Sequence, residues 1–110
     1  MTMAKKITQK TKTPMPARDA AERARTFQEV ALGYTVEMAV AEASRCIECK
    51  NEPCIAGCPV EIDIPKFVRE VASGDFKAAW GTLSEKNLLP AICGRVCPQE
   101  EQCEAHCVLG

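Results

Sequence analysis

Residues 46–59 read CIECKNEPCIAGCP, and residues 93–107 read CGRVCPQEEQCEAHC. These two stretches hold all eight cysteines of the 110-residue chain, and 34 residues lie between Cys58 and Cys93. Only five residues are aromatic, so a domain of this size has little apolar material for a core and needs a metal or another cross-link. Eight closely spaced ligands in two groups predict two metal sites with four cysteines each.

The spacing of the cysteines favours iron–sulfur ligation. The stretches resemble the bacterial ferredoxin pattern, in which three close cysteines and a remote one hold each [4Fe–4S] cube and the cysteine before proline serves the other cluster. In this chain Cys58 precedes Pro59 and Cys97 precedes Pro98. Each of the four iron corners needs one thiolate, so a short loop wraps three corners and the fourth ligand comes from elsewhere. We therefore expect two [4Fe–4S] clusters.

The cysteine spacing leaves other roles open. Two structural zinc sites of four cysteines each, in a protein-interaction domain, are the main alternative, although only Cys46 and Cys49 form the CxxC pair that zinc knuckles use. Four disulfides and a redox-active Cys46–Cys49 pair are weaker, because no export signal and no βαβ pattern accompany them. His106 is an alternative cluster ligand, but eight cysteines already satisfy two cubes.

Charge and hydropathy exclude several classes of partner. The net charge is −1, made of +5 over residues 1–25 and −6 over the rest. We expect residues 1–16 to form a flexible basic tail before a helical iron–sulfur domain over residues 17–110. No aromatic residues interleave the lysines, so nucleic-acid binding is not expected. No apolar run suits a membrane span and no signal peptide begins the chain, so a cytoplasmic location is predicted.

Apolar residues at helical spacing predict an all-α domain. We expect a helical stretch around residues 27–34, a helix that begins at the N-cap Thr35, and a loop over residues 50–62. Two further helices are expected to start at Asp63 or Ile64 and at the cap Asp75, with Gly74 between them. Two short helical turns should carry the last four cysteines. The apolar stripes of these helices are interpreted as core.

Several stretches together identify a family resemblance. They are RARTFQEVALGYT (23–35), EASRCIECKNEPCIAGCPVEIDIPKFV (42–68), GDFKAAW (74–80) and LPAICGRVCPQEEQCEAHCVLG (89–110). Over about four-fifths of its length the chain resembles the N-terminal iron–sulfur domain of the NAD(P)H-dependent glutamate synthase small subunit. The same domain occurs in the large subunit of ferredoxin:NADP oxidoreductase (sulfide dehydrogenase) and in dihydropyrimidine dehydrogenase. The resemblance implies an α-helical ferredoxin fold with two [4Fe–4S] clusters.

The resemblance also implies how the ligands are shared. Cluster one takes Cys46, Cys49, Cys54 and Cys107. Cluster two takes Cys58, Cys93, Cys97 and Cys103. Beyond the ligands, we expect Gly57 and Gly94 to permit close backbone approach and N–H···S bonds. We expect Arg95 either to offset cluster charge or to form a surface ion pair.

In this family, electrons pass between an FAD/NAD(P)H-binding flavoprotein domain and a partner, such as the glutamate synthase large subunit. The six glycines of the present chain include no G-x-G pair, so a dinucleotide fingerprint is absent. FAD and NADPH are therefore expected only in domains that this sequence lacks or in a partner. The chain resembles one part of an oxidoreductase and is expected to relay electrons without turning over a substrate alone.

Overall fold

The computed structural model of the protein describes residues 10–109, and within this range it is helical with no strand. The elements are α1 (Ala20–Arg23), α2 (Val36–Ala43), α3 (Pro53–Gly57), α4 (Ile64–Ala72), α5 (Phe76–Ser84), α6 (Pro90–Val96), the 3-10 helix η1 (Gln99–Glu101) and α7 (Cys103–His106). One isolated antiparallel bridge joins Ala17 and Ala31. The all-α prediction is confirmed.

The three longest helices begin at the predicted caps. The side chains of Thr35, Asp63 and Asp75 each accept a hydrogen bond from the backbone N–H three residues later, at 3.2, 3.3 and 3.0 Å. Pro65 lies in the first turn of α4, where its missing N–H leaves no bond unmade. Gly74 follows α4 with a φ of 84°, a left-handed conformation that suits glycine.

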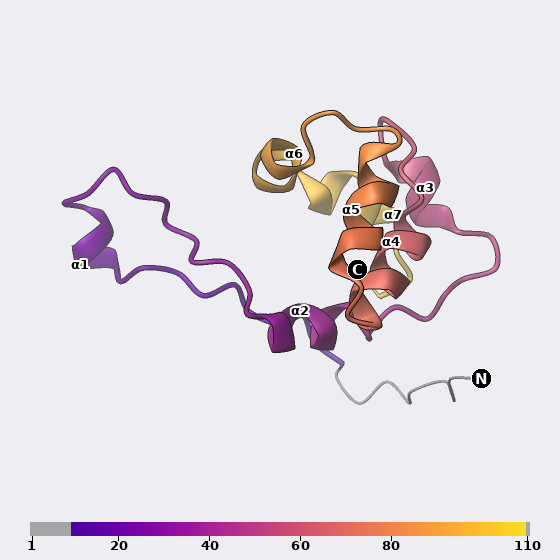
Figure 1. Cartoon of the computed structure of the whole chain (residues 1–110). Helices are drawn as coiled ribbons and strands as arrows, with labels where there is room; N and C mark the ends of the chain where they lie inside the picture. The colour runs from indigo at the N-terminus through magenta and orange to yellow at the C-terminus, as the bar shows by residue number, and fades with distance from the viewer. Residues whose placement is uncertain (1–9, 110) are drawn as a thin grey trace.

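The core lies where α4 packs against α2 and α5, and a second contact joins α3 to α7 (Figure 1). Ile62 and Ala79 are buried, but Phe76 and Trp80 of α5 are 41% and 56% exposed. The prediction that every apolar stripe belongs to the core is therefore wrong in part. The stripe residues that lie exposed are Phe27, Val30, Tyr34, Val36, Ile47, Phe76 and Trp80.

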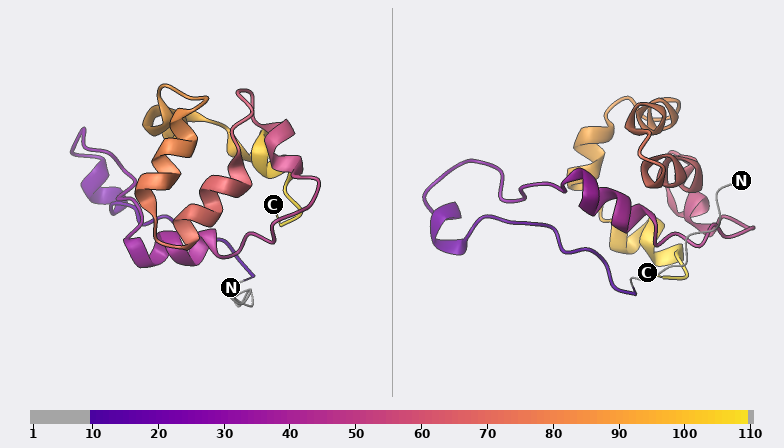
Figure 2. Two further views of the ribbon diagram at one scale, coloured as in Figure 1. Left: turned by 45° about the vertical axis from the view of Figure 1, so that its right-hand side comes forward. Right: turned by 60° about the horizontal axis from the view of Figure 1, so that its bottom comes forward.

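Residues 16–32 form an arm that extends away from the helical body (Figures 1 and 2). The backbone N–H of Arg18 donates to the carbonyl of Val30 at 2.8 Å, and that of Leu32 donates to Pro16 at 2.7 Å. The predicted helix over 27–34 is wrong, and Phe27 is fully exposed. An isolated short helix is marginal unless its apolar face packs, so this segment pairs with residues 16–18 instead.

The structure also corrects the loop expected over residues 50–62, since α3 lies within it. Of the expected tail, residues 1–9 lie outside the described residues. Further along, the backbone N–H of Thr13 donates to Glu42 of α2 at 2.7 Å, and the Lys12 ammonium pairs with Glu104 of α7 at 2.6 Å. No helix within residues 10–109 has the length and apolar character needed to cross a bilayer.

Candidate metal centre

Three short helices position six of the eight cysteines in the same way. Each holds one cysteine within the helix and a second cysteine as its C-cap four residues later, so the two side chains lie about one turn apart. The pairs are Cys54 and Cys58 on α3, Cys93 and Cys97 on α6, and Cys103 and Cys107 on α7. Cys46 and Cys49 lie in the loop after α2. All eight are free thiols, so the disulfide alternative finds no support.

A glycine allows two of these helices to meet. A Cβ built on Gly57 of α3 lies 2.7 Å from the carbonyl oxygen of Gln102 and 2.7 Å from Nδ1 of His106. It also lies 3.1 Å from Cα of Cys103. These distances are shorter than ordinary contacts, so α3 and α7 approach closely only because residue 57 lacks a side chain. The expected role of Gly57 beside a cluster stays a prediction.

Three glutamates within or just after the first cysteine group, residues 46–58, have unusual backbone conformations. Glu48, Glu52 and Glu61 have positive φ values of 52°, 46° and 52°. Glu48 lies between Cys46 and Cys49, and Glu52 begins α3 as a cap residue without a side-chain hydrogen bond. A left-handed conformation is unfavourable for glutamate, and strained residues of this kind gather at ligand-binding sites. The cysteine loops are therefore shaped against local preference.

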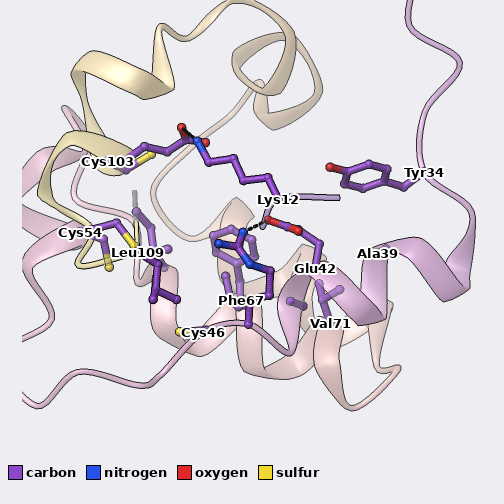
Figure 3. Close-up of a pocket in the computed structure, with 16 residues that line it drawn as sticks. Lys12, Tyr34, Ala39, Glu42, Cys46, Cys54, Phe67, Val71, Cys103 and Leu109 are labelled. Carbon is purple, nitrogen blue, oxygen red and sulfur yellow. Dashed lines mark hydrogen bonds and ion pairs between the residues drawn. The ribbon is translucent and has the colours of Figure 1, made fainter. Parts of the chain in front are cut away.

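A cavity of about 360 Å³ opens between α2, α4 and α7. Its lining includes the thiols of Cys46, Cys54, Cys103 and Cys107, and its opposite part includes Tyr34 and Glu42 (Figure 3). Apolar side chains of α4 line the cavity as well, among them Ile64, Phe67, Val68 and Val71. Lys12 extends across it to reach Glu104. The cavity brings together cysteines from both ends of the sequence.

Burial and neighbouring thiols affect the ionisation of Cys54 in the first group. Burial raises the pKa of the Cys54 thiol, and the charges of Cys46 and Cys107 raise it further. Thiolates that gather in this way repel one another unless a cation lies between them. A bound metal cluster removes that repulsion, and its binding releases the thiol protons.

A second group of thiols interacts around Cys58. Burial raises the pKa of Cys97, with further increases from Cys93 and Cys58. Burial also raises the pKa of Cys103, and the charge of Cys58 adds to this shift. The Cys93 thiol lies 3.8 Å from the amide oxygen of Asn87.

The donor set fits an iron–sulfur cluster. Thiolates are the soft ligands that bind such clusters and zinc. A single tetrahedral zinc ion, with bonds of about 2.3 Å, needs its four sulfurs within about 4 Å of one another. Within residues 10–109, no three Cys, His, Asp or Glu side chains lie close enough to share one metal ion. A match to a 4Fe-4S family, given below, leaves the zinc alternative without support.

The remaining expected site residues differ in what surrounds them. Arg95 forms the surface ion pair that was one of its two expected roles, with Nε 2.6 Å from Glu29 Oε1. Nothing within the described residues lies within 4 Å of a Cβ built on Gly94. A role for Gly94 near a cluster therefore stays a prediction. His106 is exposed, and its Nδ1 lies 2.9 Å from the carbonyl oxygen of Gln102.

The cavity also includes a charged residue that the sequence analysis missed. Arg45 lies directly before Cys46, lines the cavity and is only 7% exposed. Its Nη1 donates to Glu42 Oε1 at 2.6 Å (Figure 3). Burial raises the pKa of Glu42, but hydrogen bonds from Thr13 and Arg45 lower it more, and the net pKa is below the usual value. The position next to a ligand was the available signal in the sequence.

Comparison with known proteins agrees with this site. The family described as dihydropyrimidine dehydrogenase domain II, 4Fe-4S cluster, matches residues 23–110. The NAD-dependent dihydropyrimidine dehydrogenase subunit PreT of Salmonella typhimurium is 43% identical over 81 residues, covering 74% of this chain and 20% of that protein. The NADPH glutamate synthase small chain of Azospirillum brasilense is 37% identical over 92 residues, covering 84% and 19%. The same small chain of Halomonas elongata is 40% identical over 90 residues, covering 82% and 19%. The chain spans about a fifth of the length of these relatives.

Proposed function

Since the chain belongs to the dihydropyrimidine dehydrogenase domain II family of 4Fe-4S cluster domains, we propose that it is an electron-transfer module with two [4Fe–4S] clusters. When bound, such a cluster takes up and releases one electron. The chain itself supplies the thiolates, and four of its cysteines line a largely apolar cavity. Low solvent access and fixed dipoles around a cluster are the means by which a protein sets its potential.

The observation that carries the proposal is that cysteines from both ends of the sequence meet, since Cys46, Cys54, Cys103 and Cys107 line one cavity. Three of these four belong to the set that we propose for cluster one, which is Cys46, Cys49, Cys54 and Cys107. We propose the other four cysteines, Cys58, Cys93, Cys97 and Cys103, for cluster two. Cys49 joins the first set because it lies between Cys46 and Cys54 in the chain.

We propose a flavoprotein as the electron-transfer partner. The relatives are named as an NAD-dependent dehydrogenase subunit and as an NADPH-dependent small chain, and this chain matches only about a fifth of each. FAD and NAD(P)H binding is thus assigned to the rest of such a protein or to a separate subunit. We propose a glutamate synthase large subunit as a further candidate partner. We propose a cytoplasmic location, because eight cysteines without a disulfide suit a reducing compartment.

The decisive experiment is metal analysis of anaerobically purified protein. We expect about eight iron and eight acid-labile sulfide per chain, no zinc, and a visible absorbance that bleaches with dithionite. About four iron and four sulfide would contradict the second cluster. Two zinc ions with no sulfide, in protein never exposed to air, would overturn the electron-transfer proposal as a whole.

Single substitutions test how the ligands are shared. Cys107→Ser should remove cluster one and leave the electron paramagnetic resonance signal of cluster two. Cys103→Ser should do the reverse, although the two residues lie on the same short helix. His106→Ala is the matched control on α7, and it should keep both signals. The assignment is wrong if Cys107→Ser and Cys103→Ser remove the same signal.

A further inference from the structure

Arg45 is a buried cation whose hydrogen bonding is incomplete. Its side chain is 8% exposed, and Glu42 alone among charged side chains of residues 10–109 pairs with it. The Nε atom is inaccessible and has no hydrogen-bond partner within the described chain. A buried donor without an acceptor is destabilising, and native proteins contain few such groups. The unsatisfied Nε–H therefore needs an explanation.

The surroundings of Arg45 point to an anionic acceptor. The residue adjoins Cys46 in the chain and lines the same cavity as Cys46, Cys54, Cys103 and Cys107, and all of these except Cys103 belong to the proposed cluster one. Glu42 and Glu104 are the acidic side chains in that lining, and Glu104 is already paired with Lys12. Thiolate sulfur is thus the remaining anionic atom type in the cavity, and a cluster adds further sulfur there.

We propose that Arg45 is the fixed positive charge facing the cluster of Cys46, Cys49, Cys54 and Cys107, that it donates its Nε–H toward that sulfur-rich site, and that it raises the reduction potential of this cluster. The inference deepens the proposed function and rests on it. Arg45 binds no iron itself, so its proposed effect on the cluster is electrostatic.

The sign of the effect follows from elementary electrostatics. Reduction adds one negative charge to the cluster, so a nearby fixed cation stabilises the reduced form more than the oxidised form. Burial makes this interaction stronger than it would be in water, since the low dielectric screens it less. Glu42 opposes the effect from the other side of the guanidinium, where it accepts from Nη1. Removing Arg45 and removing Glu42 should therefore shift the potential in opposite directions.

The experiment is a redox titration of both clusters, followed by electron paramagnetic resonance, in the anaerobically purified full chain. Arg45→Gln should lower one of the two potentials by at least a tenfold change in the reduction equilibrium, which is about 59 mV for one electron. Arg45→Lys should recover more than half of that shift, because it restores the charge. Glu42→Gln should raise the same potential. The other cluster should stay unchanged in all three variants.

Arg69→Gln is the matched control. It removes the same charge near the same cysteines, since Arg69 pairs with Glu48 between Cys46 and Cys49 at 3.1 Å. The Arg69 side chain is 60% exposed, so water and salt screen it and the expected change is below threefold. A shift as large as that of Arg45→Gln would mean that any nearby cation has the same effect, and it would overturn the inference.

Three further results with the Arg45 variants would overturn the inference. The inference is wrong if Arg45→Gln leaves both potentials within threefold of wild type, if it moves both clusters equally, or if Arg45→Lys recovers nothing. If Arg45→Gln does not retain iron, the sign of the Glu42→Gln shift decides, and a rise supports the inference whereas no rise overturns it. Wild-type protein without iron and sulfide would instead overturn the proposed function itself.

Discussion

The scaffold helices and the cysteine-bearing helices of this molecule begin in different ways. In the scaffold helices α2, α4 and α5, an N-cap side chain accepts a backbone hydrogen bond at the start of each helix. In the cysteine-bearing helices α3, α6 and α7, no cap side chain does so, and none of these helices exceeds seven residues. The difference teaches that local sequence signals specify the scaffold, whereas the cysteine segments depend on what their thiols bind.

Removal of the metal should give the largest effect and should separate the two regions. For the protein treated anaerobically with an iron chelator, we expect amide hydrogen exchange to accelerate strongly over residues 53–57 and 90–107. Protection over residues 64–84 should fall less, because α4 and α5 pack on each other without a thiol. Equal loss of protection in both regions would contradict the distinction.

Gly57→Ala should give the next largest effect, since it forces a methyl group into backbone atoms of α7. We expect a loss of about 1–3 kcal/mol in unfolding free energy, together with incomplete iron loading, measured by urea unfolding and metal analysis. Gly81→Ala in α5 is the matched control. Open space surrounds it, and alanine is the better helix former, so stability should stay equal or rise by up to about 1 kcal/mol.

Glu42→Gln tests the hydrogen bonds that Glu42 of α2 accepts from Thr13 and Arg45. Hydrogen bonds from Thr13 and Arg45 keep the pKa of Glu42 below its usual value of 4.5. The ionised form therefore contributes stability above the unfolded-state pKa, and this contribution disappears as pH falls through the folded-state pKa. We expect Glu42→Gln to cost about 1–2 kcal/mol from about pH 8 to about pH 5 and less below about 4.5. Urea unfolding followed by Trp80 fluorescence measures this, and a difference that grows on acidification would contradict it.

Asp75→Ala tests the caps themselves. Loss of the bond to the Ala78 N–H should destabilise the protein by about 1 kcal/mol in the same unfolding assay. Gln102→Ala is the control from the other region, because Gln102 begins α7 without a side-chain capping bond. We expect it to change stability by less than about 0.5 kcal/mol. Similar losses in both variants would remove the difference between the two kinds of helix.

We expect the smallest change in stability at Glu61, one of the glutamates with a left-handed backbone conformation. Glu61→Gly relieves an unfavourable φ of 52° but increases the freedom of the unfolded chain, so the two effects nearly cancel and stability should change by less than about 0.5 kcal/mol. Glu85→Gly, at the helical φ of −60° after α5, has no strain to relieve and should cost about 0.5–1 kcal/mol. Equal losses in thermal unfolding would show that the backbone at Glu61 is unstrained.

Sequence reasoning was reliable where a local interaction decides the structure. Thr35, Asp63, Gly74 and Asp75 mark helix ends through bonds or conformations within a few residues, and each prediction is confirmed. The expected helix around Phe27 failed because spacing alone does not show whether a second surface exists to cover an apolar face. Arg45 was missed for a related reason, since its burial depends on α2, α4 and α7 meeting around it.

The close approach at Gly57 has a consequence for the rate of electron transfer. Under the proposed assignment, α3 and α7 each contribute one ligand to either cluster, through Cys54 and Cys58 and through Cys107 and Cys103. The pair of helices is then a rigid spacer that fixes the tunnelling distance between the two redox centres. A fixed distance gives a fixed rate of electron transfer between the two centres.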